Sequence, residues 1–280
     1  MPMTPPVIAL VLFAAVLHAT WNAVLRSGAD RLWTITVMSF ATTAAALACA
    51  PWLPLPARAS WPCLALSALL QVGYSVFLAH AYKGAELGQV YPMVRGAIPV
   101  LVALGGYLWA GQRLDAGALA GVLLISGGIA SLVLGRRRIA RRPLVAALAT
   151  SLFVAGYVTT DGVGARLAGD SRAYAVWIFV VYGVLMPAAF VLHGRRLGSG
   201  HAWRETAKAA AGGVISMIGY TATVAALSLG PIGPVSALRE TSIVFSLILG
   251  WACLGERPTG QRIAAAAAVV AGAACLAYRA

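Results

Sequence analysis

Residues 94–113 read VRGAIPVLVALGGYLWAGQR, and residues 238–257, which follow at an offset of 144, read LRETSIVFSLILGWACLGER. In both stretches an apolar residue and an arginine come first, an apolar run follows, and Gly-X-Arg comes last. Gly128 and Gly272 extend the match at the same offset. Two stretches related in this way indicate that the chain was built by repetition of one unit.

The repeat also extends upstream of these blocks. Gly-Tyr-Ser at 73–75 resembles Gly-Tyr-Thr at 219–221 if two residues are dropped between the segments. The chain is therefore predicted to contain two related halves, residues 1–138 and residues 139–280.

The composition places both halves in a membrane. Of the 280 residues, 60% are hydrophobic and only 10% are charged, and the mean hydropathy is +0.83. Soluble domains contain about 25% charged residues, and a membrane-spanning helix needs about 20 mostly apolar residues. Clusters of Pro, Gly and charge then divide the chain into ten predicted spans and leave no soluble domain. The predicted spans are residues 6–25, 33–50, 61–83, 90–110, 115–135, 143–161, 172–193, 206–228, 234–254 and 260–278.

An odd number of spans in each half has a topological consequence. The second half must enter the membrane upside down, so the two five-helix repeats are predicted to be inverted with respect to each other. Secondary transporters commonly have this arrangement and bind their substrate near the middle of the bilayer, between the repeats. The expected fold is an all-α integral membrane protein of ten transmembrane helices around a central cavity.

The formal charge of +13 has an explanation in membrane topology. Lys and Arg accumulate in cytoplasmic loops. Arg95 and Arg239 lie well inside spans. Of the 19 other basic residues, 14 are assigned to odd-numbered loops and 5 to even-numbered loops and termini. The odd-numbered loops are therefore predicted to be cytoplasmic and both termini to be outside. Nucleic-acid binding is not expected, because no basic stretch accompanies a soluble module.

Sequence patterns for catalysis are missing. The sequence contains no phosphate-binding glycine loop, no His/Asp/Glu metal cluster and no supported Ser-His-acid set. The four cysteines lack the spacing of metal ligands, and no ring of like charges or filter sequence suggests a channel. We therefore expect no catalytic residue, no metal and no cofactor, and we disfavour a channel or a membrane-embedded enzyme.

Four segments carry a family resemblance. They are YPMVRGAIP at 91–99, LRETSIVF at 238–245, LGER at 254–257 and HATWN at 18–22. Together they resemble the EamA family of the drug/metabolite transporter superfamily. The resemblance implies a ten-helix transporter of small metabolites, often amino acids, in the bacterial inner (plasma) membrane. One departure is Gln112, where the second half has Glu256.

Charged side chains inside spans are the first candidates for a substrate site, because a charge at a helix centre costs about 2.5–3.5 kcal/mol on insertion scales. Arg95 and Arg239 occupy matching places in the two halves. We expect both to line the cavity near its two gates and to attract an anionic group such as a carboxylate. The alternative is that each extends to the membrane interface or pairs with a neighbouring acid.

Two acids are candidates for a coupling proton or an ammonium group. Glu240 follows Arg239 directly and could equally be a structural partner of an arginine. Asp161 lies at the end of the predicted sixth span. It is expected either at the cavity mouth or, the interpretation we favour, at the start of the following loop.

Aromatic and polar side chains complete the predicted substrate site. Tyr74 and Tyr220 lie near mid-span and offer an apolar face, a cation–π surface and a hydroxyl, although packing explains them equally well. The remaining candidates are Gln71, Asn22, Trp21 and Trp177.

Three prolines are expected to shape the spans that contain them. Pro92, Pro99 and Pro187 should interrupt their helices and provide hinges or expose backbone carbonyls.

The sequence thus predicts a secondary transporter of a small amphiphilic metabolite, such as an amino acid or a related carboxylate-bearing zwitterion. The alternative is a proton-coupled exporter of cationic or quaternary amines, with the tyrosines as an aromatic cage and an acid as counter-ion. The expected partners are a small-molecule substrate, the lipid bilayer and, as an option, a coupling proton.

Overall fold

The computed structural model describes residues 3–27, 30–81, 87–133, 141–192, 194, 202–254 and 257–278. Throughout these ranges the ordered elements are helices, and no strand is present. The helices are α1 (Pro5–Ser27), α2 (Arg31–Cys49), α3 (Trp61–Ala81), α4 (Leu87–Ala110), α5 (Ala116–Ser131), α6 (Arg141–Leu167), α7 (Ser171–Leu192), α8 (Trp203–Leu229), α9 (Ile232–Arg239), α10 (Ser242–Leu254) and α11 (Gly260–Ala277). Two short 3-10 turns, η1 (Ala50–Trp52) and η2 (Arg58–Ser60), join α2 to α3.

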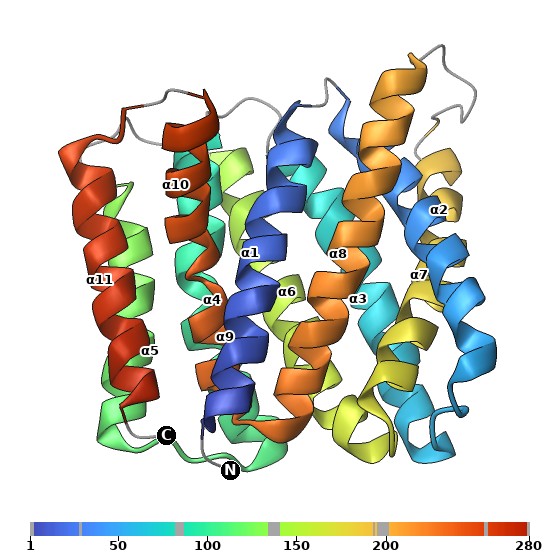
Figure 1. Cartoon of the computed structure of the whole chain (residues 1–280), viewed down its shortest axis with the longest axis horizontal. Helices are drawn as coiled ribbons and strands as arrows, with labels where there is room; N and C mark the ends of the chain where they lie inside the picture. The colour runs from blue at the N-terminus through green and yellow to red at the C-terminus, as the bar shows by residue number, and fades with distance from the viewer. Residues whose placement is uncertain are drawn as a thin grey trace.

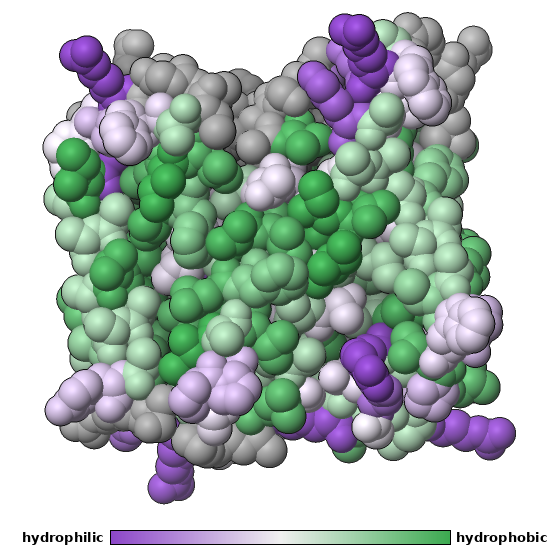
Figure 2. Space-filling view, in the orientation of Figure 1, coloured by the Kyte–Doolittle hydropathy of each residue, from purple (hydrophilic) through white to green (hydrophobic). Residues whose placement is uncertain are grey.

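Nine of the ten predicted spans are confirmed within this described part of the chain. Nine helical segments are long and apolar enough to cross a membrane, with α9 and α10 together forming one of them. The tenth, α5, is apolar but only 16 residues long. Large apolar side chains stand exposed on the outside of the bundle, and Figure 2 shows them as a broad band between more polar edges. Such a surface needs lipid as its solvent.

The helices stand side by side as a bundle, and both chain termini lie at the same edge (Figure 1). The helix pairs in contact recur when each span is exchanged for its counterpart in the other half. The packing of α3 on α6 corresponds to that of α8 on α1, and the packing of α2 on α8 to that of α7 on α3. The pairs α2–α7, α4–α9 and α5–α11 each join a span to its own counterpart.

Glycines allow a close approach between α5 and α11. A Cβ atom at Gly121 would lie 2.9 Å from the Gly272 carbonyl oxygen, and one at Gly272 would lie 2.7 Å from the Gly121 oxygen. In the same way, a Cβ atom at Gly128 would lie 3.2 Å from the Ala265 carbonyl oxygen. Because Ala265 and Gly272 follow Gly121 and Gly128 at the offset of 144, the two contacts exchange places when the halves are exchanged.

The prediction that prolines interrupt their helices is wrong. The helix α4 continues through Pro92 and Pro99, and α7 continues through Pro187. Membrane helices tolerate proline because neighbouring groups and local adjustments satisfy the freed carbonyls.

The interrupted span is the ninth, which contains no proline at its break. It divides at Glu240 and Thr241 into α9 and α10. The Glu240 amide donates to the Ala237 carbonyl at 2.9 Å, and the Thr241 amide donates to the Leu238 carbonyl at 3.1 Å. These bonds tighten the last turn of α9. The Thr241 hydroxyl also donates to the Leu238 carbonyl, at 2.8 Å. Local hydrogen bonds of this kind compete with the helical ladder, so the break follows from the polar residues at this point.

Candidate functional site

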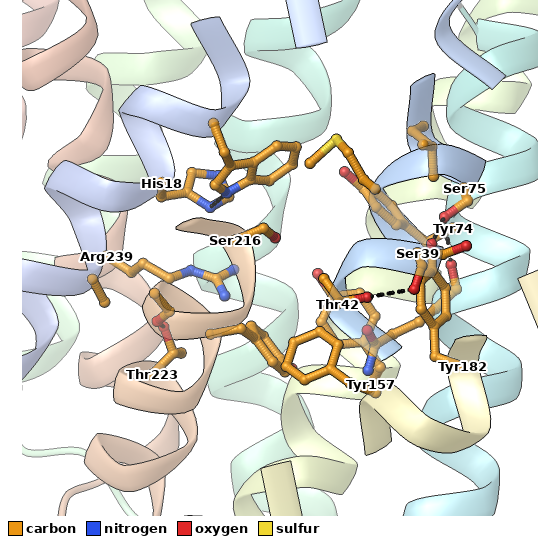
Figure 3. Close-up of a pocket in the computed structure, with 18 residues that line it drawn as sticks. His18, Ser39, Thr42, Tyr74, Ser75, Tyr157, Tyr182, Ser216, Thr223 and Arg239 are labelled. Atoms are coloured by element: carbon orange, nitrogen blue, oxygen red, sulfur yellow. Dashed lines mark hydrogen bonds between the residues drawn. The ribbon is translucent and has the colours of Figure 1, made fainter. Parts of the chain in front are cut away.

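A cavity lies in the middle of the bundle, between the two halves (Figure 3). The volume of the cavity is about 100 Å³. Its walls come from α1, α2, α3, α6, α7, α8 and the end of α9. The lining residues are Ala14, His18, Trp21, Ile35, Met38, Ser39, Thr42, Gln71, Tyr74, Ser75, Tyr157, Phe179, Tyr182, Ser216, Gly219, Tyr220, Thr223 and Arg239.

One wall of the cavity is a chain of aromatic rings. Tyr157 meets Tyr74 and Tyr220 edge-to-face, with ring centroids 5.9 and 6.0 Å apart. Phe179 meets Tyr220 in the same way, at 6.0 Å. This geometry is the preferred one for aromatic pairs. It presents a large, rigid, weakly polar surface to whatever occupies the cavity.

Hydroxyl groups cover much of the remaining wall. Ser75 and Tyr182 share a hydrogen bond of 3.1 Å, and Thr42 donates to the Ser39 carbonyl at 2.8 Å. At another part of the wall, the Trp21 indole donates to His18 Nδ1 at 3.2 Å. The cavity therefore offers neutral hydrogen-bonding groups around its aromatic side.

The charged group at the cavity is Arg239. It is the last residue of α9, immediately before the helix break, and only 3% of it is exposed. Its guanidinium extends into the open space of the cavity (Figure 3). Among the described residues, no carboxylate forms an ion pair with it, and its Nε atom has no hydrogen-bond partner. The side chain thus brings a positive charge with unused donors to the cavity wall.

A buried carboxylate lies behind one of the tyrosines. Asp161 is fully buried, and its two oxygens accept hydrogen bonds from the Tyr220 hydroxyl and, at 3.0 Å, from the Tyr174 hydroxyl. Ser67 is a third side-chain partner, and Gln71, which lines the cavity, donates to Ser67 at 3.1 Å. Four helices, α3, α6, α7 and α8, meet at this network.

The favoured interpretation of Asp161 as a loop residue is wrong. The helix α6 runs to Leu167, six residues beyond the aspartate. Arg166 therefore lies in the last turn of α6 and not in a loop, because its side chain bonds to free carbonyl groups at the end of α8. Its Nη2 donates to the Leu227 and Gly230 carbonyls, at 3.1 and 2.7 Å. A cation at a helix C-terminus is favourable, and it allows α6 to continue.

The other acid is paired with the other arginine. Arg95 Nη1 donates to Glu240 Oε1 at 2.9 Å, and Nη2 donates to the Ser242 hydroxyl at 3.1 Å. Neither Arg95 nor Glu240 is among the cavity-lining residues. The two matching arginines therefore have different surroundings: Arg239 faces the cavity, whereas Arg95 joins α4 to the break between α9 and α10.

Of the other predicted site residues, some line the cavity and others do not. Trp21, Gln71, Tyr74 and Tyr220 line the cavity. Asn22 is buried beside it and donates to the His18 carbonyl at 2.8 Å. Trp177 packs against a cluster that includes Tyr174 and is not part of the cavity wall.

Several lining residues were not among the candidates. Tyr157 and Tyr182 are the largest polar ones. A usable signal was the pair Ser39 and Thr42, whose spacing of three places both hydroxyls on one face of an apolar helix. Burial of the tyrosines against one another depends on how α3, α6, α7 and α8 assemble, and no pattern within one span encodes it.

Comparison with known proteins agrees with this architecture. A model of the EamA-like transporter family matches residues 141–278. The chain belongs to the EamA family. This family is part of the drug/metabolite transporter superfamily, so the resemblance seen in the sequence is confirmed.

A solved crystal structure has the same fold as this EamA protein. It superposes on 96% of this chain and 95% of its own chain with a TM-score of 0.78, at 21% sequence identity. A comparison with curated proteins gives no significant match. Membership of the EamA family makes this a multi-pass membrane protein of the transporter type.

Proposed function

We propose that the protein is a secondary transporter that moves a small amphiphilic zwitterion, such as an amino acid, by alternating access. The observation that carries the proposal is the placement of opposite charges at one cavity. The Arg239 guanidinium extends into the cavity, and the Asp161 carboxylate lies behind Tyr220. A molecule with a carboxylate and an ammonium group complements this pair.

In this proposal each end of the substrate has its own partner. The carboxylate accepts from Arg239, whose planar fork suits two parallel hydrogen bonds. The ammonium group lies at the aromatic wall near Tyr220, where the ring faces and the nearby Asp161 charge favour a cation. The apolar part of the substrate contacts Tyr74, Tyr157 and Phe179. Asp161 takes this role in preference to Glu240, because Glu240 is already paired with Arg95.

Alternating access is supported by the symmetry of the packing. The exchange of helix pairs between halves, and the reciprocal glycine contacts of α5 and α11, fit two inverted repeats, residues 1–138 and 139–280. A discontinuous span beside the site is a frequent feature of secondary transporters, and the break at Glu240 adjoins Arg239.

The Asp161 network would form the closed side of the pathway. Tyr174 lies in the first turn of α7 and Asp161 in the last two turns of α6, toward the edge of the bundle that holds both termini (Figure 1). The distribution of basic residues assigns this edge to the outside of an inner (plasma) membrane. Outward release would therefore require the Tyr220–Asp161 hydrogen bond to break, with a proton at Asp161 as one way to lower the cost.

The second candidate is export of a cationic or quaternary amine, coupled to protons. The chain of Tyr74, Tyr157, Tyr220 and Phe179 favours it, because stacked aromatic faces bind such cations. The positive charge of Arg239 at the same cavity opposes it.

The proposal is tested by thermal unfolding of the purified protein with amino acids, organic anions, nucleosides and quaternary amines. A ligand at 100 times its Kd stabilises the folded state by about 2.7 kcal/mol and raises the Tm. We expect stabilisation by a carboxylated zwitterion. In Arg239→Gln the same ligand should bind at least about tenfold more weakly, because a charged hydrogen bond is worth about 1.5–3 kcal/mol.

Arg58→Gln is the matched control, because Arg58 is exposed in the turn before α3. It should keep the full ligand-induced shift. Stabilisation only by amines without a carboxylate, unchanged or larger in Arg239→Gln, would replace the zwitterion proposal with the amine exporter.

A further inference from the structure

Among the described residues, four charged side chains are buried in the bundle, and their charges balance. Arg95 and Arg239 are positive, Asp161 and Glu240 are negative, and none is more than 5% exposed. Asp161 and Arg239 are the two that the proposed substrate would face. The other two form an ion pair of 2.9 Å, and neither of them lines the cavity.

The ion pair adjoins the cavity. Glu240 follows Arg239 directly in the chain, and Arg239 lines the cavity. Ser242, the other partner of Arg95, begins α10 on the far side of the same helix break. In a low-dielectric interior, interactions between charges are weakly screened. The balance between Arg95 and Glu240 therefore sets part of the potential that a ligand in the cavity experiences.

The pair is asymmetric with respect to the two halves. Arg95 and Arg239 match, but Glu240 corresponds to Gly96 in the first half. Position 96 has no room for an acid, because a Cβ atom there would lie 3.1 Å from the Ala130 amide nitrogen and 3.3 Å from the Ser126 carbonyl oxygen of α5. Position 240 accommodates one at the helix break. A single carboxylate is thus available close to the two arginines, and its Oε1 is bonded to Arg95.

The second oxygen of Glu240 is the other informative feature. Glu240 is fully buried, and its Oε2 atom has no hydrogen-bond partner within the described part of the chain. Packing alone would be served better by an apolar side chain, since a buried ion pair contributes little net stability. We therefore infer that Glu240 has a role in addition to packing.

We propose that Glu240 is a specificity-determining residue that limits the effective positive charge of the cavity to that of Arg239. By offsetting Arg95, it selects substrates with one carboxylate and one ammonium group over substrates with a second carboxylate. This inference rests on the proposed function and adds to it the charge class of the substrate. Glu240 acts through Arg95 and does not contact the ligand.

The proposal predicts opposite effects for the two members of the pair. Glu240→Gln keeps the shape of the side chain, removes its negative charge and makes the cavity potential more positive, so ligands with an additional carboxylate should bind relatively better. Arg95→Gln leaves the Glu240 charge and should disfavour them further. Because loss of stability alone would affect all ligands alike, opposite shifts in the two variants cannot come from impaired folding.

The experiment measures binding of two nearly isosteric ligand pairs, glutamine with glutamate and asparagine with aspartate, by calorimetry on the purified protein. The wild-type protein should prefer the neutral-side-chain member of each pair. In Glu240→Gln the ratio of the two Kd values should move by about tenfold toward glutamate and aspartate. In Arg95→Gln it should move in the opposite direction, and the double variant, which removes both charges, should return to the wild-type ratio.

The outcomes separate this inference from the function on which it rests. If the wild-type protein binds glutamine or asparagine in an Arg239-dependent way and the ratio is the same in all four proteins, the role of Glu240 is overturned and the zwitterion transporter stands. If no protein binds any of the four amino acids, the role of Glu240 is overturned, and the zwitterion proposal fails as well if no carboxylated zwitterion in the wider panel stabilises the wild-type protein. If Glu240→Gln does not fold, an unchanged ratio in Arg95→Gln still overturns the proposal.

Discussion

Replacement of Asp161 by alanine should lower the free energy of unfolding by about 3 kcal/mol and abolish ligand-induced stabilisation. The carboxylate is fully buried and accepts from Tyr174, Tyr220 and Ser67. Without it, buried hydroxyls remain unpaired, and each costs about 1–3 kcal/mol. Tyr220 also loses the bond that fixes its position in the cavity wall. Thermal and denaturant unfolding of the purified protein measure the effect.

The control for Asp161 is the nearby acid Asp170. Asp170 lies just before α7, where it accepts from the Arg172 amide at 2.8 Å and from the exposed Arg172 side chain. Asp170→Ala should cost only about 1 kcal/mol, as expected for loss of a helix cap, and should leave ligand binding intact. If Asp161→Ala lowered the free energy of unfolding by no more than Asp170→Ala does, the buried network would not stabilise the bundle.

The second large effect is expected at the contact between α5 and α11. Gly272→Val should lower the free energy of unfolding by about 3 kcal/mol. Its Cβ atom would lie 2.7 Å from both the Gly121 oxygen and Ile125 Cγ1, and overpacking of a tight contact, with the backbone shifts that it forces, typically costs about 1–3 kcal/mol and occasionally more. The helices would have to separate, which is visible as a lower Tm in detergent.

Gly127 supplies a matched control on the same helix pair. A Cβ atom there meets nothing within 4 Å, so Gly127→Ala should be neutral or stabilise the protein by up to about 1 kcal/mol through helix propensity. Gly121→Ala, the reciprocal of the Gly272 contact, should be destabilising as well. If Gly272→Val were as stable as Gly127→Ala, the close packing of α5 on α11 would be excluded.

The sequence predicted the spans well because lipid imposes length and composition on each of them separately. The predicted 61–83 corresponds to α3, and 172–193 to α7, within two residues. The exception was the sixth span, which ends six residues later than predicted. Arg166 looked like a loop residue in sequence, yet it bonds to the carbonyls at the end of α8. That contact depends on tertiary structure.

The candidate site was only partly predictable for the same reason. Charge and aromatic content drew attention to Arg239, Tyr74 and Tyr220, which line the cavity. Symmetry suggested the same position for Arg95, but the single acid at the break pairs with Arg95. Which of two equivalent arginines is paired depends on a side chain that only one half possesses, and on the space around it.

The short helix α5 has a consequence for the lipid around the protein. Its 16 residues span about 24 Å at 1.5 Å per residue, whereas the hydrocarbon core of a typical bilayer is about 30 Å thick. Thinning of the bilayer beside α5, or extension of flanking side chains to the interface, accommodates this difference at a cost of fractions of a kcal/mol for each ångström of mismatch. The other nine segments are long enough for an ordinary bilayer, so any change in lipid thickness should be confined to the lipid beside α5.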